Sequence, residues 1–255
     1  MTTQTTQVES VEISLSANAA TIKLDTDKRY KILLKDYENL PFECTKGSPL
    51  ENIIIDVEKA ESTVTNRHFD GDTVAFLRFL SRKYTLYNAA MSKAAFTDMS
   101  KKSLYQKLYY GALKNKVPIE PAELKELCEL VCDEFEDAGY VNDTRYALDK
   151  AKQLKEYKKY GKNKIKEYLY QKGVSKAAID EALEDEFFED EDGDFENMLS
   201  LLYKKYRRTG IDKTDRNAVA KAINLLSRNG YSYAQAKKAV TEFIESMESE
   251  ETEED

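Results

Sequence analysis

Three cysteines and one histidine are the side chains of this 255-residue chain best suited to metal binding or nucleophilic chemistry. Cys128 and Cys132 are four residues apart, so a helix would present both thiolates on one face, and Cys44 and His68 could complete a zinc site. Apolar residues with helical spacing surround these two cysteines, which favours a core role: Leu124, Leu127, Val131 and Phe135. The odd number of cysteines also disfavours a disulfide framework. We therefore predict free, buried thiols and no metal.

Short motifs typical of nucleotide, hydride, acyl or zinc chemistry are absent from the sequence, including glycine-rich phosphate loops and the His-Glu-x-x-His pair. His68 has no nearby partner in sequence that would orient it as a general base, so we interpret it as a turn residue. Carboxylates occur in runs, at 184–186 and 189–192, which are typical of solvated segments. The sequence predicts no enzyme, no catalytic residue and no cofactor.

Hydrophobic periodicity divides the chain into a small strand-containing unit and a long helical part. Apolar and polar residues alternate near Val11 and near Tyr30, whereas from Thr73 onward the period is helical. Only 9 Gly and 4 Pro occur, too few for a turn-dense β protein. No apolar run approaches the roughly 18 residues of a membrane span, and residues 1–7 do not resemble a signal peptide. We expect a cytoplasmic protein that binds no membrane.

The helical part repeats itself. Residues 171–178 align with residues 228–235, so that Gly173 matches Gly230. In both copies the glycine can end a helix in the left-handed conformation, and a serine two residues later can cap the next helix. An earlier copy at 100–112 has Ala112 in place of the glycine. Small units of this kind cannot bury their apolar faces alone, so we predict tandem three-helix repeats stacked into an elongated, curved array.

These patterns predict a mainly α protein with five segments: a β-containing unit at 1–82, three-helix repeats at 83–139, 140–187 and 188–247, and an acidic disordered tail at 248–255. Asp143 stands where it could cap the helix of the second repeat, and Gly139 could end the helix before it. We interpret Asp143, Gly161, Gly173 and Gly230 as helix caps and breaks.

Charge is sorted into blocks along the chain. The formal net charge is −8, yet residues 144–178 contain eleven Lys or Arg against three acidic residues. Residues 180–196 then contain eleven acidic and no basic residues, and 201–238 contain ten basic against two acidic. Lysines interleave with tyrosines at 155–162, as expected for a surface that follows a phosphate backbone or an acidic protein groove. A solvated helix face with half-buried tyrosines is the alternative.

Several of these motifs resemble the RecX family of recombinase regulators. Residues 139–147, 160–169 and 172–174 resemble its second repeat, residues 225–233 its closing repeat, and Ser100 with Leu104, Lys107 and Leu108 its first. Together they cover residues 88–247. The chain departs from the family pattern at Ala112, in the long linker 114–123 and in the acidic insert before the third repeat.

The resemblance implies a non-enzymatic modulator of the RecA recombinase. Such a protein lies along the groove of the RecA–DNA filament and inhibits strand exchange, ATP hydrolysis and coprotease action in DNA repair and the SOS response. We expect a monomer that meets DNA directly or through the filament. An independent single-stranded nucleic-acid-binding protein and a helical scaffold for another protein stay open. By position, the filament-contact candidates are Lys155, Lys158, Lys159, Lys162, Lys164, Lys166, Lys204, Lys205, Arg207 and Arg208.

Overall fold

The computed structural model describes residues 6–62 and 72–253, so His68 and the turn predicted around it lie outside the described residues. The chain forms two compact units. Unit 1 comprises Met1–Phe96 with Lys107–Glu134, and unit 2 comprises Thr97–Gln106 with Phe135–Asp255. Within the described residues there are eleven α-helices and one three-stranded sheet, which confirms the prediction of a mainly helical chain with a small N-terminal strand unit.

The sheet of unit 1 is antiparallel, in the order β1 (Val8–Ser14), β2 (Ala19–Leu24) and β3 (Arg29–Leu33). Turn residues with positive φ connect the strands, Asn18 at 46° and Asp27 at 57°, a conformation that Asn and Asp tolerate. The central strand β2 is buried and forms much of the local core. Two short helices follow, α1 (Leu34–Glu38) and α2 (Val57–Ser62).

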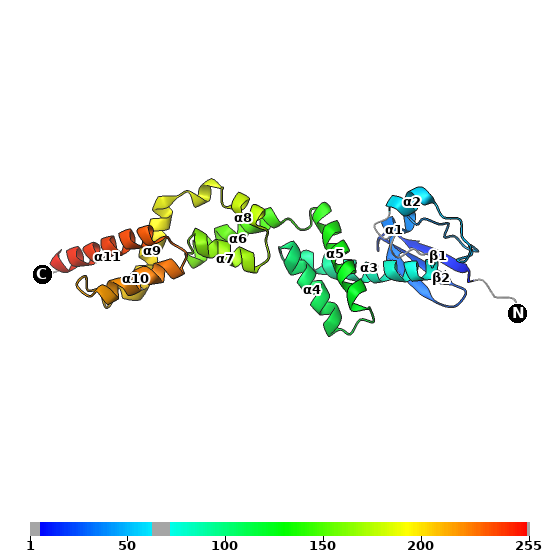
Figure 1. The fold of residues 1–255 in the computed structure, drawn as a ribbon, viewed down its shortest axis with the longest axis horizontal. Coiled ribbons are helices and arrows are strands. Elements are labelled where there is room, and N and C mark those ends of the chain that lie inside the picture. Colours follow the sequence, from blue (N-terminus) through cyan, green and yellow to red (C-terminus); the bar gives the residue numbers. More distant parts are fainter. Residues whose placement is uncertain (1–5, 63–71, 254–255) are drawn as a thin grey trace. The chain divides into compact units, whose positions relative to one another are not determined.

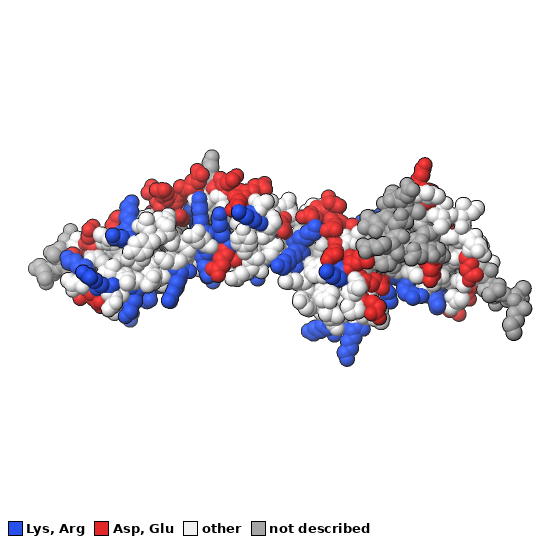
Figure 2. Space-filling view, in the orientation of Figure 1, with Lys and Arg blue, Asp and Glu red and all other residues white. Residues whose placement is uncertain are grey.

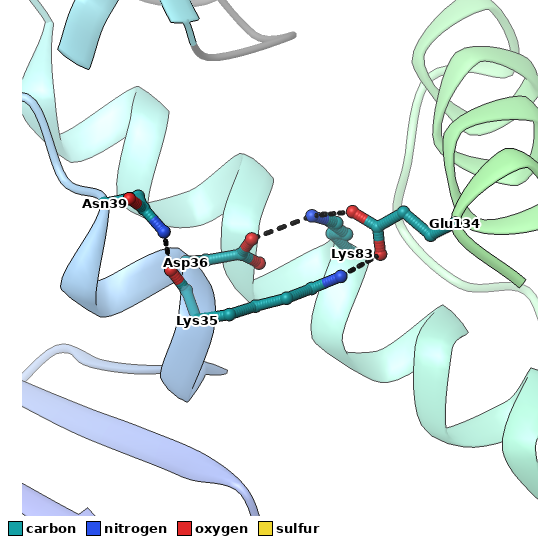
Figure 3. A network of polar contacts seen from close by, with 5 residues as sticks. All are labelled: Lys35, Asp36, Asn39, Lys83 and Glu134. Carbon is teal, nitrogen blue, oxygen red and sulfur yellow. Dashed lines mark hydrogen bonds and ion pairs between the residues drawn. The ribbon is translucent and has the colours of Figure 1, made fainter. Parts of the chain in front are cut away.

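A buried polar network joins α1 to α3 (Thr73–Ala94) and α5 (Pro121–Asp137) within unit 1. Helix α4 (Lys101–Lys114) lies between α3 and α5 in sequence and contains residues of both units. The Lys83 side chain, 5% exposed, lies 2.8 Å from Asp36 Oδ1 and 2.5 Å from Glu134 Oε1 (Figure 3). Lys35 Nζ lies 2.9 Å from the second oxygen of Glu134. Burial raises the pKa of Asp36 although Lys83 opposes the shift. Because a buried charge without a partner is costly, these ion pairs specify how α1 packs against α3 and α5.

The cysteines lie in the core, as predicted. Cys128 and Cys132 are buried on the apolar face of α5, together with Leu124, Leu127 and Val131, and Cys44 is also buried. Burial raises the pKa of Cys44 to about 12 and that of Cys128 to about 11. In the described part of the chain, no three His, Cys, Asp or Glu side chains are grouped so as to hold a metal ion. Nor does any helix found there have the length and apolar character needed to cross a membrane.

Unit 2 contains two three-helix repeats (Figure 1). Each repeat has its own apolar core. Helices α6 (Asp143–Lys158), α7 (Lys162–Gln171) and α8 (Lys176–Ala182) form the second repeat of the chain around residues such as Ala151, Ile165 and Ile179. A 3₁₀ turn, η2 (Glu186–Phe188), leads to the third repeat, formed by α9 (Glu191–Tyr206), α10 (Arg216–Arg228) and α11 (Tyr233–Glu253). The predicted alternation of helix, glycine and helix is confirmed. Helix α11 continues to Glu253, so the prediction of a disordered tail is wrong for residues 248–253.

Candidate interaction surface of the helical repeats

Two glycine turns have the predicted backbone conformation. Gly173 follows α7 at φ 78° and Gly230 follows α10 at φ 97°. Two residues later, Ser175 Oγ accepts from the amide of Ala178 at 3.2 Å, and Ser232 Oγ accepts from the amide of Gln235 at 3.3 Å. Both capping predictions are therefore confirmed. Gly139 also has the left-handed conformation, at φ 73°, after the end of α5.

The prediction that Asp143 caps its own helix is wrong. Asn142 is the N-cap of α6, and its side chain accepts from the amide of Arg145 at 2.8 Å. Asp143 Oδ1 instead accepts from the amide of Lys101 at 2.8 Å, at the start of α4. Burial raises the pKa of this carboxyl, opposed by the Lys101 amide. Local sequence shows that Asp143 can cap a helix, but only the packing selects which helix start lies opposite it.

Consecutive repeats are joined by hydrogen bonds at two places, a first junction around Ser100 and Lys172 and a second junction around Gly161 and Asn229. At the first, Ser100 Oγ donates to the Lys172 carbonyl at 2.7 Å. At the second, the Gly161 amide donates to the Asn229 carbonyl at 2.8 Å. In each case the residue before the middle helix of one repeat binds the residue that ends the middle helix of the next. The junctions are thus equivalent positions of the repeat.

Gly161 lies at a break between helices, as predicted, and it is the N-cap of α7. Its φ is −77° and it begins α7, whereas Lys159, at φ 56°, provides the left-handed end of α6. The absence of a side chain matters because the second junction is tight: a Cβ on Gly161 would lie 2.7 Å from the carbonyl carbon and oxygen of Gly230. Tyr231 closes the same junction by donating from its hydroxyl to the Lys159 carbonyl at 3.0 Å.

The structure separates the ten basic contact candidates by environment. Lys155 is buried. Its Nζ forms an ion pair with Asp194 Oδ1 at 2.9 Å and donates a hydrogen bond to the Phe187 carbonyl at 2.9 Å. It stabilises the fold and presents no cation to a partner, so we withdraw it from the set of contacts.

Lys164 and Lys166 form surface ion pairs, with Glu167 at 2.7 Å and Asp180 at 2.9 Å. Lys205 lies over the ring of Tyr206, with its Nζ 5.2 Å from the ring centroid. The remaining candidates have no acidic partner within ion-pair distance among the described residues. They form two groups: Lys158, Lys159 and Lys162 at the α6–α7 turn, and Lys204, Arg207 and Arg208 at the end of α9.

Four further cations at the junctions were not among the sequence candidates. Arg228 precedes the Asn229 carbonyl of the second junction, and its side chain is exposed. Lys102, Lys172 and Lys176 are exposed around the first junction, where a Cβ on Gly173 would overlap the Lys102 side chain. The alignment of Gly173 with Gly230 pairs Arg228 with Gln171 and Lys172 with Asn229, so the repeat pattern carried no signal for these cations.

The acidic insert is folded onto α6. Asp185 Oδ2 lies 3.1 Å from Lys152 Nζ, and Asp194 pairs with the buried Lys155. The Phe187 amide and Lys152 lower the pKa of Asp185. Figure 2 shows the acidic side chains gathered over the segment from α8 to α9. A polar cavity of about 490 Å³ lies beside it, lined by residues of both repeats, including Glu191, Asp194, Lys162 and Gln235. The insert therefore neutralises part of the basic block, and Lys162 of the α6–α7 turn shares this cavity with carboxylates of the insert.

Comparison with known proteins identifies the family of these repeats. The family model described as "RecX, second three-helix domain" matches residues 142–183, from the N-cap of α6 to the end of α8. Regulatory protein RecX of Clostridioides difficile (strain 630) is 30% identical over 158 residues, which cover 62% of this chain and 67% of that protein. The protein of the same name from Vibrio campbellii (strain ATCC BAA-1116) is 31% identical over 153 residues, covering 60% and 88%.

The chain belongs to the RecX family. Its fold is also similar to that of a regulatory protein RecX whose crystal structure is known. The alignment covers 94% of this chain and 99% of the crystallised chain, with a TM-score of 0.63 and 16% sequence identity. The resemblance read from the sequence is thereby confirmed, and the chain is a RecX-type regulatory protein.

Proposed function

We propose that this RecX-family protein binds the RecA–DNA filament and modulates its activity, mainly by inhibition, as a regulator without catalytic activity of its own. The observation that carries the proposal is family membership, with the matched relatives both called regulatory protein RecX. The repeat boundaries 83–139, 140–187 and 188–247 are part of this proposal, and the repeats at 140–187 and 188–247 supply the cations assigned to the filament contact.

The charge distribution supports a filament partner. Cations without acidic partners in the described residues stand at the α6–α7 turn, where Lys158 and Lys162 are exposed and Lys159 is half-buried, and at the end of α9. The acidic insert is held against α6. A filament that carries DNA presents phosphates at regular spacing, and cations that approach them release counterions and gain affinity. Charge blocks of opposite sign on one unit also orient the protein as it approaches.

The test is a RecA ATPase assay on single-stranded DNA, titrated with this protein at two salt concentrations. Wild-type protein is expected to inhibit ATP hydrolysis, more weakly at the higher salt. Charge reversal at Lys158, Lys159 and Lys162 to Glu is expected to abolish inhibition while helical content by circular dichroism stays the same.

The matched control reverses three exposed lysines of unit 1, Lys46, Lys114 and Lys125, and should inhibit as the wild type does. Unchanged inhibition by the α6–α7 turn variant would refute the assigned contact surface. A wild-type protein that neither RecA nor DNA retains would refute the function and favour the scaffold interpretation.

A further inference from the structure

A groove of about 270 Å³ lies on helix α10 of the third repeat. Its floor is aliphatic: Ile223 is buried, Val219 is half-buried and Ala220 is exposed. Tyr233, 67% exposed at the start of α11, also lines this α10 groove, together with Asn224. An aliphatic floor that is open to solvent is typical of a surface that another molecule covers.

Two cations line the α10 groove where the helix begins, Lys213 and Arg216. Lys213 Nζ lies 2.7 Å from Glu248 Oε1 of α11, so one cation already holds a carboxylate that a helix presents. Arg216 is exposed and has no acidic partner within ion-pair distance in the described part of the chain. Its guanidinium is therefore available to a carboxylate from outside, which it can bind through two parallel hydrogen bonds.

The α10 groove lies at the position where a repeat of this chain receives the next repeat. The alignment of the two glycine turns matches Gly161 with Ala218, which directly precedes Val219. In the second repeat the Gly161 amide donates to the Asn229 carbonyl at 2.8 Å, so this position receives the end of a helix. Within the described residues, no helix of another repeat covers the corresponding position of the third repeat.

The floor residues differ in polarity from their counterparts in the second repeat. Val219 corresponds to Lys162. Ala220 corresponds to Asn163. Because α7 has polar residues at these positions, the folding of a repeat does not require aliphatic side chains there. The aliphatic floor of α10 therefore points to a binding role.

Charge selects the occupant of the α10 groove. The C-terminal end of a helix has unpaired carbonyls and the negative pole of the helix dipole, and both complement Arg216 and Lys213. A second copy of this chain is disfavoured, because α7 and α10 already end at junctions and α4 ends in Lys114, with Lys116 close behind. The groove cations would repel these lysines, so the occupant is an acidic helix end of another protein.

A nucleic-acid strand fits the α10 groove less well. Asp212 directly precedes Lys213, Asp215 directly precedes Arg216, and Glu248 is paired with Lys213. These three carboxylates oppose phosphates. The floor is also aliphatic, whereas unpaired bases bind by stacking on aromatic side chains.

We propose that the α10 groove binds the acidic C-terminal end of a helix of a partner protein, with an apolar side chain on Val219 and Ile223 and a carboxylate on Arg216. This inference rests on the proposed function for the identity of the partner, which is then RecA. It gives the third repeat a protein contact that is separate from the cations of the α6–α7 turn.

The experiment measures binding of the full chain, labelled at its N-terminus, to RecA without DNA by fluorescence anisotropy. The groove variant carries Arg216→Glu and Ala220→Glu, both at exposed positions. The matched control carries Lys221→Glu and Ser227→Glu, which change the charge of α10 equally at exposed positions outside the groove. The groove variant should bind at least about tenfold more weakly, because it loses a charge-assisted hydrogen bond and places a carboxylate on the apolar floor. The control should bind as the wild type does.

A second groove variant, Arg216→Gln, removes the cation without altering the floor and should also weaken binding. Circular dichroism should show wild-type helical content in all variants. Equal binding by both groove variants and the control would overturn the proposal. So would a dimer of the wild type that only the groove variants lose, measured by sedimentation velocity, or oligonucleotide binding that only they lose.

The RecA ATPase assay separates this inference from the proposed function. Wild-type protein that inhibits ATP hydrolysis on DNA but does not bind RecA alone would overturn the α10 groove as a RecA contact and leave the proposed function standing. Wild-type protein that neither binds RecA nor inhibits it would refute the proposed function and, with it, the partner assigned to the groove.

Discussion

Alanine substitutions at three glycines of unit 2 distinguish steric overlap at the second junction from the strain of a left-handed backbone. Gly139→Ala tests strain, because the residue has φ 73° and an added Cβ would meet no atom within 4 Å. Gly161→Ala tests close approach, because its φ is ordinary but the Cβ would lie 2.7 Å from the Gly230 carbonyl group. Gly230→Ala combines both effects, with φ 97° and a Cβ that would overlap the backbone nitrogen of Lys164.

The expected losses of unfolding free energy follow from these geometries. Left-handed backbone costs an alanine about 1–2 kcal/mol, of which roughly 0.4–1 kcal/mol is offset by the lower entropy of the unfolded chain. Gly139→Ala should therefore cost about 1 kcal/mol or less. Overpacking costs about 1–3 kcal/mol, so Gly161→Ala should cost about 2 kcal/mol. Gly230→Ala should cost about 3 kcal/mol or more, because strain and overlap add.

The assay is native-state hydrogen exchange of the Gly161 amide, which donates to the Asn229 carbonyl across the second junction. A loss of about 3 kcal/mol corresponds to an increase in exchange of about a hundredfold, at roughly 1.4 kcal/mol per factor of ten. The same amide in Gly139→Ala should keep its protection. Gly161→Ala and Gly139→Ala variants of equal stability, or an unchanged amide in Gly230→Ala, would refute the assignment of these glycines to a tight junction.

Two further predictions concern buried groups. Lys155→Met should lower the free energy of unfolding of unit 2 by about 3 kcal/mol, because it leaves the Asp194 carboxylate buried without its cation. Lys158→Met, at an exposed position, should change this free energy by less than about 0.5 kcal/mol. Urea unfolding followed by circular dichroism measures both variants, and equal midpoints would show that Lys155 is not structural. Cys44 and Cys128 should react slowly with a thiol-specific disulfide reagent at pH 8, because burial raises their pKa values to about 12 and about 11 and keeps the thiols protonated. The denatured protein, which should react rapidly, is the control. Equally rapid reaction of the native protein would contradict the core placement.

Local patterns in the sequence were sufficient for most of the helical part. The left-handed glycines at 173 and 230, the serine caps that follow them and the buried face around Cys128 and Cys132 were all predicted and found. Each depends on a few neighbouring residues: a missing Cβ, a hydroxyl at the right position, or apolar spacing of three and four.

The errors and omissions concern partners far apart in the chain. Asp143 caps α4 instead of α6, and Lys155 is buried under the acidic insert. The close approach of Gly230, which leaves no room for a side chain on Gly161, was not predicted either. None of these pairings follows from charge counts or periodicity.

The sequence by itself determined the family, the repeat unit and the separation of charge into blocks, because these are properties of order along the chain. Only the tertiary structure decided which cations remain available, because ion pairing and burial depend on distances between repeats. Lys155 and Lys162 belong to the same basic run, yet one is paired inside the fold and the other lies exposed at the junction of two repeats.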